Sequence, residues 1–385
     1  MRFTFLLKIA ALTLWRSWRA SVVLLFMVIS AVAALVFLSA LAVGTNDAMI
    51  RNSTGLFSGQ IAGTGIQELE AHRLQIPGVK QVLVRRQQEI LLGTGESLES
   101  VVLMGVDPAG EKEATAYWKK TLAGTYPASG EEKIFVSQDT AKRLKLAIGD
   151  TVNLLNLKGL PLKTLTIAGI YRTGISHLDQ GLAFCPAQAL PEGATDLSVA
   201  VFLQADTLLE SIVTQYRQML PLASITAWTE FMPDLKQLID LDAICMAIVI
   251  TLVFAIVSVG ISCTFLIFTL KNLREHGIMK AMGVLPGDTA LLLMTQIGLL
   301  TVFAAAIGTL AGFLTVALFS QRGIDISAFT SHNQYFSVSG ILYPRLTGPA
   351  LLTPPLVAIL FGLAAAIWPT IYIIRKNPAD ILRSV

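Results

Sequence analysis

Four long runs of uncharged, mostly apolar residues constrain this chain more than any other feature of its sequence. They cover residues 21–44, 243–270, 289–321 and about 351–374, and each exceeds the roughly 20 residues that cross a hydrocarbon core as a helix. The 198 residues from 45 to 242 contain no comparable run. The sequence therefore predicts one membrane span, a long inserted segment and three further spans.

The composition excludes several classes of protein. Charged residues make up 14% of the chain and apolar residues 54%, whereas about 25% of an ordinary soluble domain is charged. So low a charge content argues against a soluble enzyme and against a disordered regulator. The net charge of +3 is too small to indicate a nucleic-acid partner, and three cysteines are too few for a disulfide scaffold.

The first apolar run has an alternative interpretation as a cleaved signal peptide, because residues 40–42 form an Ala-Leu-Ala cleavage box. Its apolar core is about 19 residues long, however, whereas a typical signal peptide has 7–15. A basic stretch of 20 residues also precedes it. We therefore expect this run to remain as a membrane anchor.

Lysine and arginine residues predict the orientation of the spans, because short cytoplasmic segments carry the excess of positive charge. Residues 1–20, 271–288 and 375–385 contain four, three and three basic residues, whereas residues 320–350 contain two. We therefore expect both termini in the cytoplasm and the inserted segment outside.

The expected fold class is a membrane protein of four transmembrane helices (1+3), with a large extracytoplasmic α+β domain inserted between helices 1 and 2. The expected segments are a cytoplasmic N-terminal stretch (1–20), helix 1 (21–44), the extracytoplasmic domain with a stalk (45–242), helix 2 (243–270), a cytoplasmic segment (271–288), helix 3 (289–319), an extracytoplasmic loop (320–350), helix 4 (351–374) and a cytoplasmic tail (375–385).

Short β-like runs separated by helical patterns predict the α+β class of the inserted domain. The helical patterns cover residues 137–146, with Ser137 as the cap, and residues 206–220, with Asp206 as the cap. The expected strands cover residues 101–104, 133–136, 151–157, 165–171 and 197–203.

A stalk is expected where the inserted domain meets the spans. Residues 234–242 are amphipathic and lead directly into the second span, so we expect one continuous helix, with residues 46–51 as its partner. The alternative is an ordinary loop.

Catalytic and metal-binding motifs are missing from these 385 residues. The glycine-rich stretches 93–95 and 283–287 lack the lysine of a P-loop. The four histidines are scattered without metal-binding spacing, and the apolar runs contain no charged residue that could form an ion path. We expect no enzymatic activity, no metal site and no directly bound cofactor.

Residues 271–283 can form a short amphipathic helix between two spans. Leu273, Ile278, Met279 and Met282 alternate with charged residues, and Pro286-Gly287 then breaks the chain. A helix of this kind either lies passively at the membrane interface or docks into another protein. Gly277 costs about 1 kcal/mol inside a helix relative to alanine, which favours close approach of another backbone.

Four motifs resemble those of the FtsX-like ABC permeases, a group with MacB-like, LolC/LolE-like and FtsX-like members. Residues 274–283 (REHGIMKAMG) resemble the signature R-E-I-G-I-L-R-A-L-G, and residues 144–152 resemble L-x-L-x-x-G-D-x-V. Residues 166–171 resemble V-x-G-I-[FY]. The tail resembles the ending P-x-x-x-L-R through Pro378, Leu382 and Arg383.

The resemblance implies a permease of the bacterial inner membrane that works by mechanotransmission. ATP and magnesium would bind to a separate dimer of ABC ATPase subunits, and the permease would pair with a second copy or a paralogue. The stretch 1–20 would be an amphipathic helix on the inner leaflet. The coupling helix that contacts the ATPase would comprise Leu273, Arg274, Glu275, His276, Gly277, Ile278, Met279, Lys280, Ala281, Met282 and Gly283.

Three functions remain open within this group. The layout is most similar to LolC/LolE-type permeases that release lipoproteins or lipids, with a periplasmic carrier that could contact residues 173–180. The alternatives are MacB-like drug or peptide efflux with an adaptor, and FtsX-like regulation of a cell-wall hydrolase.

Gly308 and Gly312 form a G-x-x-x-G pattern, which indicates close helix packing or arises by chance.

Overall fold

The computed structural model describes residues 9–10, 12–13, 16, 18–67, 72–94, 97–174, 176–192, 196–204, 207–326 and 341–375. These residues divide into two compact units. The helical unit comprises residues 1–46, 239–324 and 342–385, and the inserted domain comprises residues 47–238 with 325–341. Most of the predicted segment 1–20, much of the loop 320–350 and nearly all of the tail lie outside the described residues.

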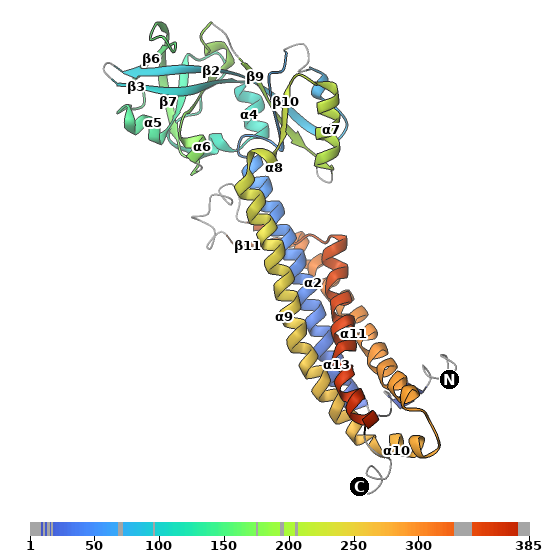
Figure 1. Ribbon diagram of the computed structural model, residues 1–385. Helices are drawn as coiled ribbons and strands as arrows, with labels where there is room; N and C mark the ends of the chain where they lie inside the picture. Colours follow the sequence, from blue (N-terminus) through green and yellow to red (C-terminus); the bar gives the residue numbers. More distant parts are fainter. Residues whose placement is uncertain are drawn as a thin grey trace. The chain divides into compact units, whose positions relative to one another are not determined.

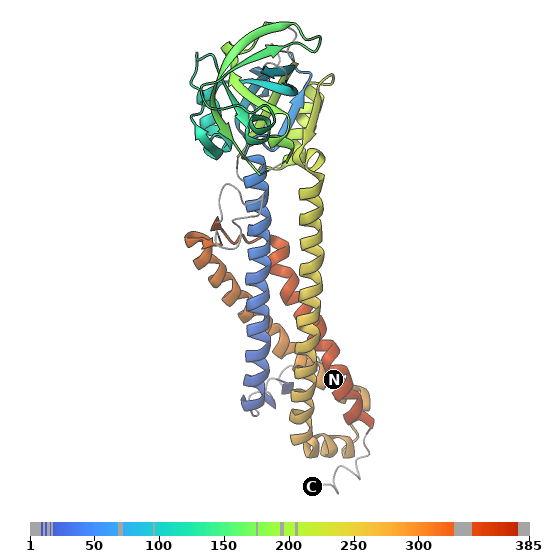
Figure 2. The same cartoon turned by 90° about the vertical axis from the view of Figure 1, so that its left-hand side faces the viewer.

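Four long helices form the helical unit: α2 (Trp18–Thr54), α9 (Pro233–Lys271), α11 (Pro286–Arg322) and α13 (Gly348–Arg375). Each is long and apolar enough to cross a membrane. They pack side by side (Figures 1 and 2) around one apolar core that all four helices share. The predicted one-plus-three arrangement of apolar helices is therefore confirmed.

The helices α2 and α9 are longer than the apolar runs that predicted them. The segment expected as a stalk is the beginning of α9, which is continuous from Pro233 to Lys271. Its expected partner belongs to α2, where the Asn46 side-chain amide donates a hydrogen bond to the Asp242 carboxylate at 3.2 Å. The two helices are thus tied together beyond their apolar parts.

The segment before α13 lies directly against α2. The short strands β11 (Ile324–Asp325) and β12 (Ile341–Leu342) pair with each other, and Arg345 N then donates to Ala40 O at 3.0 Å. A Cβ atom at Gly44 would lie 3.0 Å from the Pro344 Cα. Glycine at this position therefore permits the close approach of the two backbones.

A ten-stranded sheet is the framework of the inserted domain among the described residues, in the order β10-β1-β9-β2-β3-β8-β5-β7-β4, with β6 paired to β2 and β7. The strands are β1 (Ile61–Thr64), β2 (Val79–Thr94), β3 (Ser97–Val106), β4 (Thr121–Gly124), β5 (Lys133–Ser137), β6 (Thr151–Leu155), β7 (Pro161–Tyr171), β8 (Leu182–Pro186), β9 (Asp196–Leu203) and β10 (Ser224–Ala227).

Six of these strands close into a barrel, because β6 joins β2 to β7 and the path β2-β3-β8-β5-β7 completes the ring. Alternate side chains of each strand point inward. Ile90, Leu103, Ile134, Val152 and Ile167 are among the buried residues of this core. Closure leaves no free edge on this part of the sheet.

The strands β9, β1 and β10 extend beyond the barrel and are covered by α7 (Leu209–Met219). Ile212, Val213 and Tyr216 of α7 pack on Val199 and Val201 of β9. The short helices α4 (Pro108–Ala114), α5 (Gln138–Arg143), α6 (Ser176–Asp179) and α8 (Trp228–Phe231) complete the domain, together with the 3-10 turns η1 (His72–Leu74), η2 (Tyr117–Lys120) and η3 (Ala187–Ala189). The predicted α+β class is confirmed.

Two predicted elements have different bounds in the structure. Ser137 caps α5 as expected by accepting a hydrogen bond from Thr140 N, but the helix ends at Arg143 because Lys145 turns the chain with a positive φ of 53°. The helix expected from residue 206 begins at Leu209 instead. Its expected cap, Asp206, lies outside the described residues.

Candidate functional site

The segment between α9 and α11 forms a separate short helix, α10 (Leu273–Ala281). It ends at a turn in which Gly283 has a φ of 93°, a backbone conformation that residues with a Cβ atom rarely adopt. Pro286 then begins α11 at the position that suits proline. Gly283 and Pro286 therefore set the length of α10.

The apolar residues of α10 do not share one face, which corrects the predicted amphipathic pattern. Leu273 and Gly277 are buried within the helical unit. Ile278, Met282 and the following Leu285 are 45%, 72% and 68% exposed. Leu273 and Gly277 thus face the interior of the helical unit, whereas Ile278 and the two apolar residues of the following turn are exposed.

Other predicted coupling residues are held within the chain. Glu275 forms an ion pair with Arg16 at 3.4 Å, and the half-buried Met279 packs near Ala10 and Leu292. Arg274 and Ala281 are exposed, whereas nothing is described of the His276 side chain. The contacts of Glu275 and Met279 join α10 to the N-terminal segment.

Lys280 ties α10 to the end of α13. Its ammonium group donates to the carbonyl oxygens of Ile373 and Ile374 at 3.3 and 2.9 Å. These carbonyls belong to the last turn of α13, where unpaired acceptors and the helix dipole favour a cation. Partial burial lowers the pKa of Lys280. Leu273, which packs in the apolar core of the helical unit, and Lys280 therefore hold the inward face of α10, on which Gly277 is buried.

The glycines of the G-x-x-x-G pattern face α2. A Cβ atom at Gly308 would lie 2.8 Å from the Val32 Cβ and 2.9 Å from the Ile29 carbonyl oxygen. A Cβ atom at Gly312 would lie 2.8 Å from the Val36 Cβ. The structure thus places both glycines where α11 approaches α2 closely.

Residues 173–180, considered as a carrier-binding loop, form a compact turn where the structure describes them. Asp179 accepts hydrogen bonds from the Thr173 backbone N–H at 2.8 Å and from the Gly174 N–H at 2.8 Å. Tyr171 donates to the Leu178 carbonyl at 2.9 Å. Thr173 and Asp179 are buried, so the described part does not project as a hook.

The remaining predicted site residues are Pro378, Leu382 and Arg383, which lie outside the described residues. Within the described ranges, no group of three or more His, Cys, Asp or Glu side chains is placed to hold a metal ion.

Two family models match the chain. Residues 20–219 match the MacB-like periplasmic core domain, and residues 247–378 match the FtsX-like permease C-terminal region, which includes α10. The four apolar helices with an inserted α+β domain and the two matches define a multi-pass membrane permease of the ABC transporter class. The chain belongs to the FtsX-like permease family and contains a MacB-like periplasmic core domain.

Several relatives are similar to this chain at low identity. The lipoprotein-releasing system transmembrane protein LolC of Neisseria meningitidis serogroup B is 22% identical over 260 residues. That match covers 63% of this chain and only 61% of the Neisseria protein. LolC of Xylella fastidiosa is 21% identical over 312 residues, which cover 75% of this chain and 74% of that protein.

Two solved structures are also similar to part of the chain. The periplasmic region of MacB from Actinobacillus actinomycetemcomitans matches with a TM-score of 0.34 and 11% identity, covering 49% of this chain and 97% of that structure. The extracellular domain of the noncanonical ABC-type transporter YknZ from Gram-positive bacteria matches with a TM-score of 0.31 and 15% identity, covering 42% and 89%.

Proposed function

We propose that the chain is the permease subunit of an ABC transporter that extracts lipoproteins or lipids from the inner membrane, with ATP hydrolysed by a separate subunit. The names of the LolC relatives support lipoprotein release. The observation on which the proposal mainly rests is the outward apolar face of α10, which lies within the FtsX-like permease region.

We call this face the α10 docking face and define it as Ile278, Met282 and Leu285. Three large exposed apolar side chains, one on the short helix α10 and two in the turn that follows it, favour a protein partner that covers them. The neighbouring Arg274 is exposed and adds a polar rim. The proposed partner is an ABC ATPase subunit, which would bind the ATP and magnesium.

The proposed mechanism transmits movement of α10 to the inserted domain. Because Leu273 and Lys280 contact the neighbouring helices, a pull on α10 would also move those helices. The helices α2 and α9 are each continuous through residues of both compact units. A continuous helix is a suitable lever because its backbone hydrogen bonds resist bending. We propose that a second copy or a paralogue completes the transporter, with both termini in the cytoplasm.

Reconstitution with the ATPase subunit tests the proposed function. Proteoliposomes would contain the permease, the ATPase and an acylated lipoprotein, and release of the lipoprotein to a soluble carrier would be measured with ATP. We expect ATP-dependent release from the wild type and at least tenfold less from Met282→Asp. Leu222→Asp is the matched control, because Leu222 is 93% exposed and belongs to the inserted domain. Release that does not depend on ATP would contradict the proposal.

MacB-like efflux is the second candidate, favoured by the match of residues 20–219 to the MacB-like periplasmic core domain. The same proteoliposomes distinguish the two functions when they are loaded with a soluble peptide or drug in place of the lipoprotein. ATP-dependent efflux of that solute, without lipoprotein release, would favour the second candidate.

A further inference from the structure

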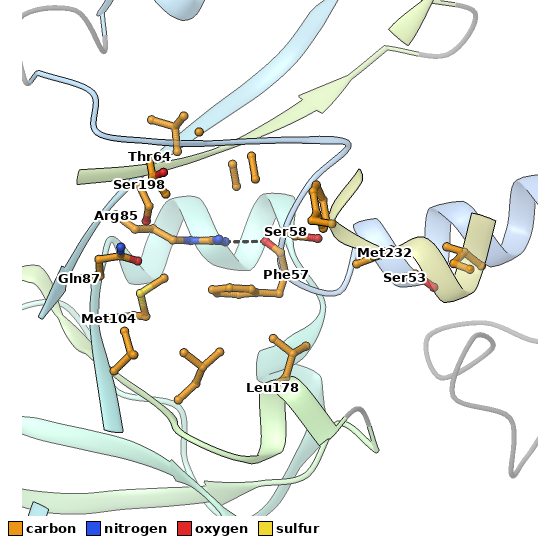
Figure 3. A pocket seen from close by; sticks show the side chains of 18 of the residues that line it. Ser53, Phe57, Ser58, Thr64, Arg85, Gln87, Met104, Leu178, Ser198 and Met232 are labelled. Atoms are coloured by element: carbon orange, nitrogen blue, oxygen red, sulfur yellow. Dashed lines mark hydrogen bonds between the residues drawn. The ribbon is translucent and has the colours of Figure 1, made fainter. Parts of the chain in front are cut away.

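A cavity of about 490 Å³ lies inside the inserted domain (Figure 3), and all of its lining residues belong to that domain. Its walls are mostly apolar, with Phe57, Met104 and Leu178 among them. Its size is within the range of about 300–1,000 Å³ that is typical of small-molecule sites.

Strand register explains why the sheet is hollow at this place. Ala62 of β1 pairs with Ala200 of β9, and Thr64 pairs with Ser198. Side chains that are directly opposite in a ladder point to the same face, and all four of these side chains are small. They line the cavity together, so the floor of the cavity is a patch of sheet that lacks large side chains.

A buried ion pair lies at one side of the cavity. The Arg85 Nε donates to Glu111 at 2.6 Å, and one terminal nitrogen, Nη2, donates to Glu111 at 3.0 Å and to the Phe57 carbonyl at 2.8 Å. Figure 3 shows Arg85 reaching toward Phe57, with the last of these bonds drawn as a dashed line. The guanidinium carbon also lies 3.9 Å above the centre of the Phe57 ring.

Three residues that line the cavity have side-chain groups without a hydrogen-bond partner among the described residues. The described residues accept hydrogen bonds from Nε and Nη2 of Arg85, which leaves the two Nη1 hydrogens for a ligand. The buried hydroxyl groups of Ser53 and Ser198 also line the cavity, and neither has a hydrogen-bond partner among the described residues. Buried polar groups in native proteins almost always have a partner.

We propose that this cavity binds one acyl chain of a lipid, with an ester or amide carbonyl of the ligand accepting hydrogen bonds from Arg85 and Ser198. The apolar walls suit an aliphatic chain. Glu111 neutralises the guanidinium, so the polar side of the cavity offers donors without net positive charge. A neutral carbonyl fits such an environment better than a free carboxylate or phosphate does.

The walls also include the two helices that continue into candidate membrane spans. Ser53 belongs to the last turn of α2, Met232 directly precedes α9, and Leu235 lies in the first turn of α9. A bound acyl chain would contact both helix ends at once. The proposal concerns the ligand of the cavity and does not depend on which cargo the transporter releases.

Photolabelling of the full-length chain in lipid nanodiscs tests the proposal. The probe is a phosphatidylethanolamine with a diazirine near the end of one acyl chain, and labelled peptides are located by mass spectrometry. We expect label on peptides of β1, β2, β3 or β9 that contain cavity residues. Ser198→Phe fills the cavity and should lower that label at least tenfold. Ser100→Phe is the matched control, because Ser100 is exposed on β3 outside the cavity.

Ala62→Phe provides a second blocked variant if Ser198→Phe does not fold, because Ala62 is half-buried and lines the same floor. Label that is equal in the blocked variants and the control, or that is confined to parts of the four long helices that do not line the cavity, would overturn the proposal. A parallel probe, a diacylated lipopeptide with the same diazirine, distinguishes the sources of the chain. Labelling by either probe supports an acyl site, and the stronger label identifies the source.

Discussion

The ion pair between Arg85 and Glu111 is the most deeply buried pair of charges in the described part of the inserted domain, with 3% and 1% of the side chains exposed. Breaking such a pair leaves one uncompensated buried charge, which typically costs about 3–5 kcal/mol. We therefore expect Glu111→Gln to lower the free energy of unfolding by that amount. Denaturant unfolding of the detergent-solubilised chain, followed by tryptophan fluorescence, measures the change.

The exposed pair of Lys163 and Glu132 is the control for this prediction, because its side chains are 26% and 69% exposed. Ion pairs near the surface contribute about 0–1 kcal/mol. Glu132→Gln should therefore change the unfolding free energy by less than about 1 kcal/mol. Equal effects of the two substitutions would contradict the assigned importance of the buried pair.

Cys185 of β8 should be an unreactive thiol in the folded protein. Burial disfavours its thiolate and raises the pKa of the Cys185 thiol from its ordinary value of 9.0 to about 12. Any stability that this group contributes is complete below pH 9 and is lost as the pH rises toward 12. We expect no alkylation by iodoacetamide at pH 8 until the chain is denatured. The experiment uses a chain in which the two exposed cysteines are replaced, Cys245→Ser with Cys263→Ser. Rapid labelling of Cys185 in this folded variant would contradict its burial.

At the scale of elements, the contact between α11 and α2 depends on Gly308. A Cβ atom there would lie within 2.9 Å of both Val32 Cβ and the Ile29 carbonyl oxygen. We expect Gly308→Ala to destabilise the chain by about 1–3 kcal/mol through overpacking. Thermal unfolding in detergent measures the effect as a lower midpoint.

Gly298→Ala is the matched control on the same helix, because a Cβ atom there would meet only Leu363 at an ordinary 3.5 Å. Alanine is also the better helix former, so this variant should keep or slightly raise the midpoint. If Gly308→Ala behaved in the same way, α11 and α2 would not be packed as closely as described.

The sequence predicts individual elements well because the signals for them are local. Each span is a continuous uncharged run, and the turn between β6 and β7 is visible in Lys158-Gly159-Leu160-Pro161. Closure of the barrel could not be predicted, since it depends on pairing between β2 and β6, such as Leu91 with Leu155. Such long-range pairing leaves no trace in a local pattern.

In the candidate sites too, features with a local sequence signal could be predicted, and features that depend on contacts between distant residues could not. The charge pattern and Pro286-Gly287 predict that α10 exists. They do not predict which of its residues are exposed. A helix of nine residues has too few turns to define an apolar stripe, and the contacts of Leu273 and Lys280 decide which side faces inward. The cavity was also missed, because Ala62 and Ser198 share a face only through the register of strands far apart in the sequence.

At the scale of the whole molecule, the proposal assigns ATP hydrolysis to a partner. The 385 residues contain no P-loop lysine in a glycine-rich phosphate-binding loop. We expect the purified chain to hydrolyse ATP no faster than buffer in a phosphate-release assay. Adding the ATPase subunit should supply hydrolysis. The wild-type permease should change the rate of the ATPase, whereas the Met282→Asp variant should leave that rate unchanged. Hydrolysis by the chain alone, in preparations free of an ATPase, would contradict this assignment.

The most direct test of the central claim is gentle purification of the chain from its native membrane, with identification of the copurifying proteins by mass spectrometry. We expect an ABC ATPase with its own P-loop to accompany the wild type and the control Leu222→Asp. Ile278→Asp combined with Met282→Asp should reduce the ATPase at least tenfold, because the loss of apolar hot-spot residues at an interface costs about 2 kcal/mol or more. Absence of an ATPase from the wild type, under conditions in which known complexes survive, or equal recovery from the double variant would contradict docking through α10.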